Sequence, residues 1–86
     1  MGDKTILVVD DDKNICKLLE LYLSNEGYKL VFCHDGSQAL DILKINTIDL
    51  ILLDIMLPVI NGWEVCKIIR QEYATPIIMI TARDLL

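Results

Sequence analysis

A chain of 86 residues forms one domain at most, and 53% hydrophobic residues with a net charge of -5 are typical of a globular domain. This acidic balance argues against direct binding of nucleic acid by this segment. No apolar run approaches the roughly 20 residues of a membrane span, and Asp3 stands where a secretory signal carries basic residues. We therefore expect a cytoplasmic protein without a membrane partner. Its cysteines, Cys16, Cys33 and Cys66, indicate reduced core residues rather than disulfides.

The first half of the chain predicts two strands, each followed by a helix. Residues 5–9 are apolar without alternation, which is typical of a strand buried on both faces of a parallel sheet. Apolar residues then recur at helical spacing, with Asp12 as the expected N-cap and Gly27 as the stop. Residues 29–33 favour a second strand, and a second helix is expected through Leu43. The apolar face of the first helix is expected at Ile15, Leu18, Leu19, Tyr22 and Leu23.

The second half predicts a central strand, a third helix and a fourth strand. Residues 50–53 are an unbroken apolar run that ends at Asp54, and Pro58 prevents the strand from continuing. Residues 61–62 open the third helix, and residues 76–81 form the fourth strand, which ends in a threonine. The buried stripe of the third helix is expected at Val65, Cys66, Ile68, Ile69 and Trp63. His34, the only histidine, is interpreted as an ordinary surface residue.

Alternation of strands and helices with short connections predicts an α/β fold. Parallel strands joined by right-handed crossovers place helices on both faces of the sheet. No glycine-rich fingerprint follows the first strand, so the flavodoxin-like arrangement is favoured over a dinucleotide-binding fold. The expected strand order is 2-1-3-4.

Aspartates follow two of the expected buried strands. Asp10, Asp11 and Asp12 come after the first strand, and Asp54 ends the central strand. The carboxyl ends of parallel strands meet at one edge of the sheet, so these carboxylates should repel one another unless a cation joins them. Helix capping is the better interpretation of Asp12, whereas the other three predict a site for a hard cation such as Mg²⁺.

Three motifs resemble the receiver domain of bacterial two-component response regulators. They are VVDDD at 8–12, DIMLPVINGWEV at 54–65 and IMITAR at 78–83, and the resemblance runs over residues 4–83. The sequence around MLP and NGWEV is most similar to that of receivers that lie N-terminal to a winged-helix DNA-binding domain. The resemblance implies a flavodoxin-like signalling module and not an enzyme with its own substrate.

The resemblance also implies a role for each matching residue. Asp54 would be the phosphoacceptor, which a sensor histidine kinase phosphorylates. Asp10 and Asp11 would hold Mg²⁺ together with Asp54, and Met56 would contribute its backbone carbonyl to the metal. Thr81 would provide the hydroxyl that follows the phosphoryl group.

The sequence departs from the family pattern after the fourth strand. Members continue through a helix, a strand that carries a lysine beside the phosphoryl group, and a last helix. We therefore expect residues 1–86 to be a single incomplete receiver domain, impaired in signalling, that self-associates through the edge of its fourth strand. The alternative is a structural fragment whose site is silent. A phosphohydrolase is less favoured, because Met56 stands where a second aspartate would act as general acid.

Overall fold

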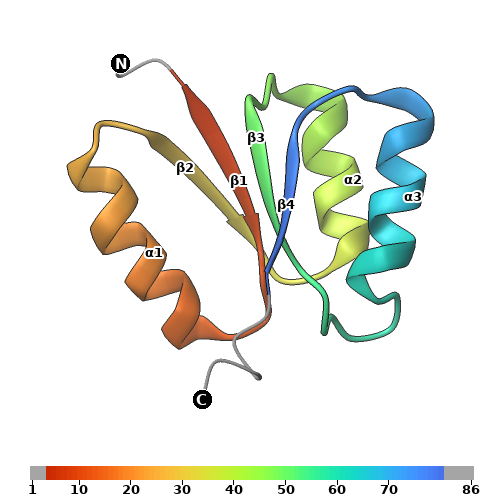
Figure 1. The fold of residues 1–86 in the computed structure, drawn as a ribbon, viewed down its shortest axis with the longest axis horizontal. Helices are drawn as coiled ribbons and strands as arrows, with labels where there is room; N and C mark the ends of the chain where they lie inside the picture. The colour runs from red at the N-terminus through yellow and green to blue at the C-terminus, as the bar shows by residue number, and fades with distance from the viewer. Residues whose placement is uncertain (1–3, 81–86) are drawn as a thin grey trace.

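The computed structural model of this chain describes residues 4–80, in which four strands alternate with three helices (Figure 1). The elements are β1 (Thr5–Val9), α1 (Lys13–Asn25), β2 (Lys29–Cys33), α2 (Gly36–Ile45), β3 (Leu50–Asp54), α3 (Gly62–Glu72) and β4 (Ile77–Ile80). The predicted order is confirmed: Leu43 lies in the last turn of α2, and β4 begins just after Pro76. Thr81 lies outside the described residues. None of the helices within 4–80 has the length and apolar character that a bilayer crossing requires.

The sheet is parallel and has the predicted strand order β2-β1-β3-β4. Val9, the last residue of β1, lies opposite Cys33 on β2 and Leu53 on β3, so these strands end together. Asp54 lies opposite Ile80 on β4. The register therefore brings the carboxyl ends of the strands to one edge of the sheet, where ligands of such folds bind.

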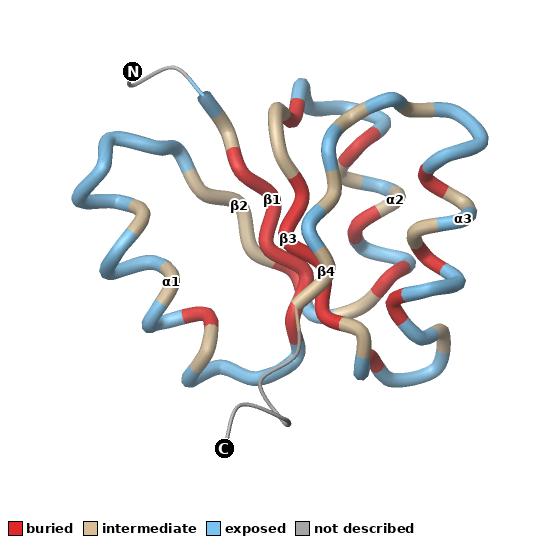
Figure 2. Tube along the Cα trace, viewed as in Figure 1, coloured by how far each residue is buried: buried red, intermediate tan, exposed pale blue. Residues whose placement is uncertain are grey.

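Helices cover both faces of the sheet, with α1 on one face and α2 and α3 on the other (Figure 1). Buried strand residues in the larger core, under α2 and α3, are Leu7, Val9, Cys33, Ile51 and Leu53. The smaller core, under α1, contains Ile6, Val8, Cys16 and Leu52. Burial is greatest along β1 and β3 (Figure 2). Each of these aliphatic side chains contributes about 1.5–3 kcal/mol by leaving water.

The face under α1 is less completely covered than the face under α2 and α3. Leu19 and Leu23 pack on the smaller core, as predicted, but Leu18 and Tyr22 are exposed rather than buried. One helix is too narrow to cover four strands, and Ile78 on β4 is 51% exposed.

Trp63 lies outside the buried stripe that the sequence predicted for α3. Its side chain is 55% exposed, whereas Gly62, Val65 and Ile69 are the buried residues of the helix. Residues 62, 65 and 69 share one helical face, and each residue turns the helix by about 100°. Burial of Gly62 therefore directs the next side chain, Trp63, away from the sheet.

Each helix begins at a polar cap on the carboxyl edge of the sheet, and Asp12 caps the first helix as the sequence predicts. The Asp12 carboxylate accepts a hydrogen bond from the Asn14 amide at 2.9 Å. Asp35 and Asn61 cap α2 and α3 in the same way. Each cap stabilises its helix by about 1 kcal/mol and fixes the loop that precedes it.

Candidate functional site

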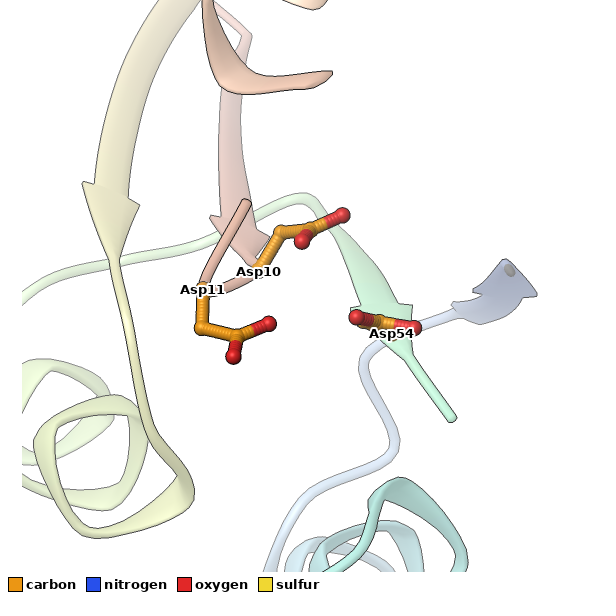
Figure 3. A group of neighbouring side chains, drawn as sticks. All are labelled: Asp10, Asp11 and Asp54. Carbon is orange, nitrogen blue, oxygen red and sulfur yellow. The ribbon is translucent and has the colours of Figure 1, made fainter. Parts of the chain in front are cut away.

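Asp10, Asp11 and Asp54 come together at the carboxyl edge of the sheet (Figure 3). Asp10 and Asp11 follow β1, and Asp54 is the last residue of β3. One carboxylate oxygen from each residue lies within 4.8 Å of the other two. Asp10 is 2% exposed and Asp54 is 7% exposed, whereas Asp11 is open to solvent. The predicted grouping of these carboxylates is therefore present in the structure.

The Asp10 carboxylate lies in an environment that disfavours its charge. Burial raises the pKa of Asp10 from 3.8 to about 6, and the negative charges of Asp54 and Asp11 add to the increase. A hydrogen bond of 2.9 Å from the Asp12 amide to Asp10 Oδ1 opposes the shift in pKa. A cation among the carboxylates would relieve this repulsion, because each negative charge would then be attracted to the ion.

Two side chains hold the backbone of Asp10, and sequence analysis did not find either contact. His34 Nδ1 lies 3.1 Å from the Asp10 carbonyl oxygen, and Cys16 Sγ donates to the same oxygen at 3.5 Å. A carbonyl can only accept, so the histidine contact requires the proton on Nδ1. His34 is exposed, as expected, yet it also supports the site. The strand register could have predicted the contact between His34 and Asp10. Val9 pairs with Cys33, so the residues that follow them, Asp10 and His34, are also neighbours.

The Asp54 carboxylate is oriented by its own loop. The Met56 amide donates to Asp54 Oδ1 at 3.0 Å, and the Ile55 amide continues the sheet by donating to the Ile80 carbonyl at 2.9 Å. Further along this loop Val59 has a φ of 66°, a conformation that β-branched residues rarely adopt. The loop therefore orients the Asp54 carboxylate through a hydrogen bond from its own backbone.

Carboxylates at the carboxyl edge of a parallel sheet define a site for a hard, oxygen-binding cation. The family comparison agrees with the fold: residues 6–85 match the response regulator receiver domain. The chain belongs to this family. Membership confirms the resemblance that the three sequence motifs carry.

Relatives with high sequence identity to this chain include transcriptional regulators and response regulators. The chain is 50% identical to the transcriptional regulatory protein CpxR of Escherichia coli K12 over 78 residues, which are 91% of this chain and 33% of the relative. It is also 50% identical to the response regulator ArlR of Staphylococcus saprophyticus over 79 residues, 92% of this chain and 36% of the relative. The chain thus spans about a third of the length of these curated relatives.

Solved structures share the fold closely. The response regulator TrrA of Thermotoga maritima, in complex with Mg²⁺ and BeF, is 41% identical with a TM-score of 0.87, covering 94% of this chain and 71% of TrrA. The BeF₃-activated receiver domain of Klebsiella pneumoniae RstA is 32% identical with a TM-score of 0.88, covering 94% of this chain and 69% of that one.

Proposed function

We propose that this chain is the phosphoacceptor module of a two-component response regulator, and that a sensor histidine kinase phosphorylates Asp54. The observation that carries the proposal is the position of Asp54, a buried carboxylate at the end of a central strand and within the acidic cluster. Strand-end carboxylates of this kind are placed for chemistry rather than for packing. The module keeps the phosphoryl group as a signal and turns over no external substrate, so it is not an enzyme in the usual sense.

The residues present fit Mg²⁺, because they offer hard oxygen donors and excess negative charge. Carboxylates of Asp10, Asp11 and Asp54 would hold the ion, with the backbone carbonyl of Met56 as a further ligand. When bound, Mg²⁺ neutralises charge on the oxygens of the transferring phosphoryl group. By the family resemblance, Thr81 would place its hydroxyl beside the phosphoryl group after transfer.

Phosphorylation of Asp54 is a nucleophilic substitution at phosphorus. A carboxylate oxygen of Asp54 forms the new bond to phosphorus while the bond from phosphorus to the donor breaks. The bonding electron pair leaves with the donor, which is the phosphorylated histidine of the kinase or a small acyl phosphate. The product is a mixed anhydride, an aspartyl phosphate, which water later hydrolyses.

The wider role follows from the relatives. Because CpxR is a transcriptional regulatory protein, we place this chain in a cytoplasmic regulator whose output is transcription. The segment carries a net charge of -5, so contact with DNA belongs to another part of such a regulator, by the resemblance a winged-helix domain.

Mass spectrometry after incubation with acetyl phosphate and Mg²⁺ tests the proposal. The wild type should gain one phosphoryl group, and Asp54→Asn should gain none. Asp41→Asn is a matched control, because Asp41 is an exposed carboxylate on α2, and this variant should react like the wild type. A phosphoryl adduct that persists in Asp54→Asn would refute the assignment. No adduct on the wild type would favour the alternative, a structural fragment with a silent site.

The edge of β4 supports a second part of the proposal, self-association of the 86-residue chain. No strand within residues 4–80 pairs with the outer edge of β4, and Ile78 on this strand is half exposed. An unpaired apolar edge is a template for a second strand. We propose that two copies pair their β4 strands antiparallel about a two-fold axis, the commonest symmetry of oligomers.

Sedimentation measures this association directly. The wild type should sediment as a dimer, and Ile78→Lys should dissociate it, because the substitution places charge within the contact. A stable interface of this kind buries on the order of 1,200–2,000 Å² in total. A dilute wild type that sediments as a compact, cooperatively folding monomer would contradict the pairing.

A further inference from the structure

Gly62, the first residue of α3, is buried directly against the backbone of the phosphoacceptor. A Cβ atom added there would overlap the carbonyl oxygen of Asp54 and lie 2.8 Å from Ile55 Cα, closer than real Cβ atoms approach. The Gly62 amide donates to the Ile55 carbonyl at 2.9 Å. Only a residue without a side chain lets α3 come this close to the acceptor.

The backbone at the acceptor is held on two sides. Ile55 donates its amide to Ile80 of β4 and accepts at its carbonyl from Gly62 of α3. Within the same segment, the Met56 amide donates to Asp54 Oδ1 at 3.0 Å. The acceptor carboxylate is thus tied to the backbone that Gly62 contacts. A displacement at Gly62 must therefore move the carboxylate as well as the loop.

Gly36 provides an internal comparison. Like Gly62, it is buried and is the first residue of a helix, in this case α2. A Cβ added at Gly36 would overlap Cγ2 of Val65, and the next nearest atoms, at 3.6 and 3.7 Å, belong to the same side chain. Alanine at either glycine therefore costs packing energy, but only at Gly62 is the obstructing group the backbone of the acceptor.

We propose that Gly62 is a positioning residue for phosphoryl transfer. Its missing side chain sets where the Asp54 carboxylate and the Met56 carbonyl stand relative to Asp10 and Asp11. The inference rests on the proposed function and deepens it. The geometry is demanding, because a misplacement of about 1 Å can lower a reaction rate by about 100-fold.

The test compares the wild type with Gly62→Ala and Gly36→Ala at equal folded fractions, measured by circular dichroism. The readouts are the dissociation constant for Mg²⁺, the maximal rate of phosphorylation by acetyl phosphate, and its half-saturating concentration. Gly62→Ala should weaken Mg²⁺ binding and lower the maximal rate by about tenfold or more each. Gly36→Ala should stay within about twofold of the wild type in both, because its obstruction is the Val65 side chain and not the backbone at Asp54.

A second measurement uses the wild type and does not require a variant to fold. Addition of Mg²⁺ with beryllofluoride, a mimic of the phosphoryl group, should shift the amide resonance of Gly62. The amide of Gly27, in the turn between α1 and β2, should not shift. Equal losses in the two alanine variants, or an unmoved Gly62 resonance, would overturn the positioning role. A wild type that accepts no phosphoryl group would overturn the proposed function itself, so the two failures are distinguishable.

Discussion

Replacing Asp10 by asparagine should stabilise the protein above pH 6 in the absence of Mg²⁺. The variant keeps the oxygen that accepts from the Asp12 amide but removes a buried negative charge. The pKa of Asp10 is raised from 3.8 to about 6 by burial and by its neighbours. At about 1.36 kcal/mol per pKa unit, this shift corresponds to an upper limit of about 3 kcal/mol.

The sign of the pH dependence follows from proton binding. Between pH 4 and pH 6 the folded wild type binds more protons at Asp10 than the unfolded chain does, so its stability decreases as the pH rises. The stabilising effect of the substitution should therefore be absent near pH 4 and fully developed above pH 6. Other carboxylates titrate in both proteins, and the difference between variant and wild type isolates Asp10.

Urea unfolding followed by circular dichroism at pH 4, 6 and 8, with a chelator present, measures this difference. Added Mg²⁺ should narrow the difference at pH 8, since an ion at 100 times its dissociation constant stabilises the wild type by about 2.7 kcal/mol and the variant by less. Asp41→Asn, which replaces an exposed carboxylate, should show no comparable pH dependence. A difference between Asp10→Asn and the wild type that is constant from pH 4 to pH 8 would refute the reasoning.

Three further substitutions test the fold around the site. Val59→Asn should raise the free energy of unfolding by up to about 1 kcal/mol, because asparagine tolerates the φ of 66° better than a β-branched residue does; unchanged stability in urea would contradict this. Ile51→Ala should lower the free energy of unfolding in urea by about 2–5 kcal/mol, because Ile51 is fully buried in the larger core. A loss below about 1 kcal/mol would show that the surrounding side chains collapse into the cavity. Asp35→Ala should cost about 1 kcal/mol by removing the cap of α2, seen as a lower melting temperature, whereas an unchanged value would mean that another group replaces the cap.

Parts of the site could be predicted from local sequence because the signals are local. Apolar runs that end in aspartate mark buried strands and the residues at their carboxyl ends, and the structure brings Asp10, Asp11 and Asp54 together. The caps Asp12 and Asn61 follow from their positions just before helical periodicity begins.

Other features could not be predicted, because they depend on how complete elements pack. Helical spacing assigned Trp63 to the buried stripe of α3, but the close approach of Gly62 to the sheet turns Trp63 to solvent. Spacing likewise assigned Leu18 and Tyr22 to a buried face, whereas a single helix leaves them exposed. Periodicity predicts which residues share a helix face, but it does not predict how much of that face the sheet covers.

The sequence by itself determined the order of elements, the parallel sheet with its strand order, the helix caps and the carboxylates that gather at one edge. Tertiary structure alone decided the burial that raises the pKa of Asp10, the support of its carbonyl by His34, and the contact of Gly62 with the backbone of Asp54. The physical reason is one of range. Periodicity and capping act over a few neighbouring residues, whereas desolvation, repulsion and steric contact depend on distances between segments that only the packed sheet brings together.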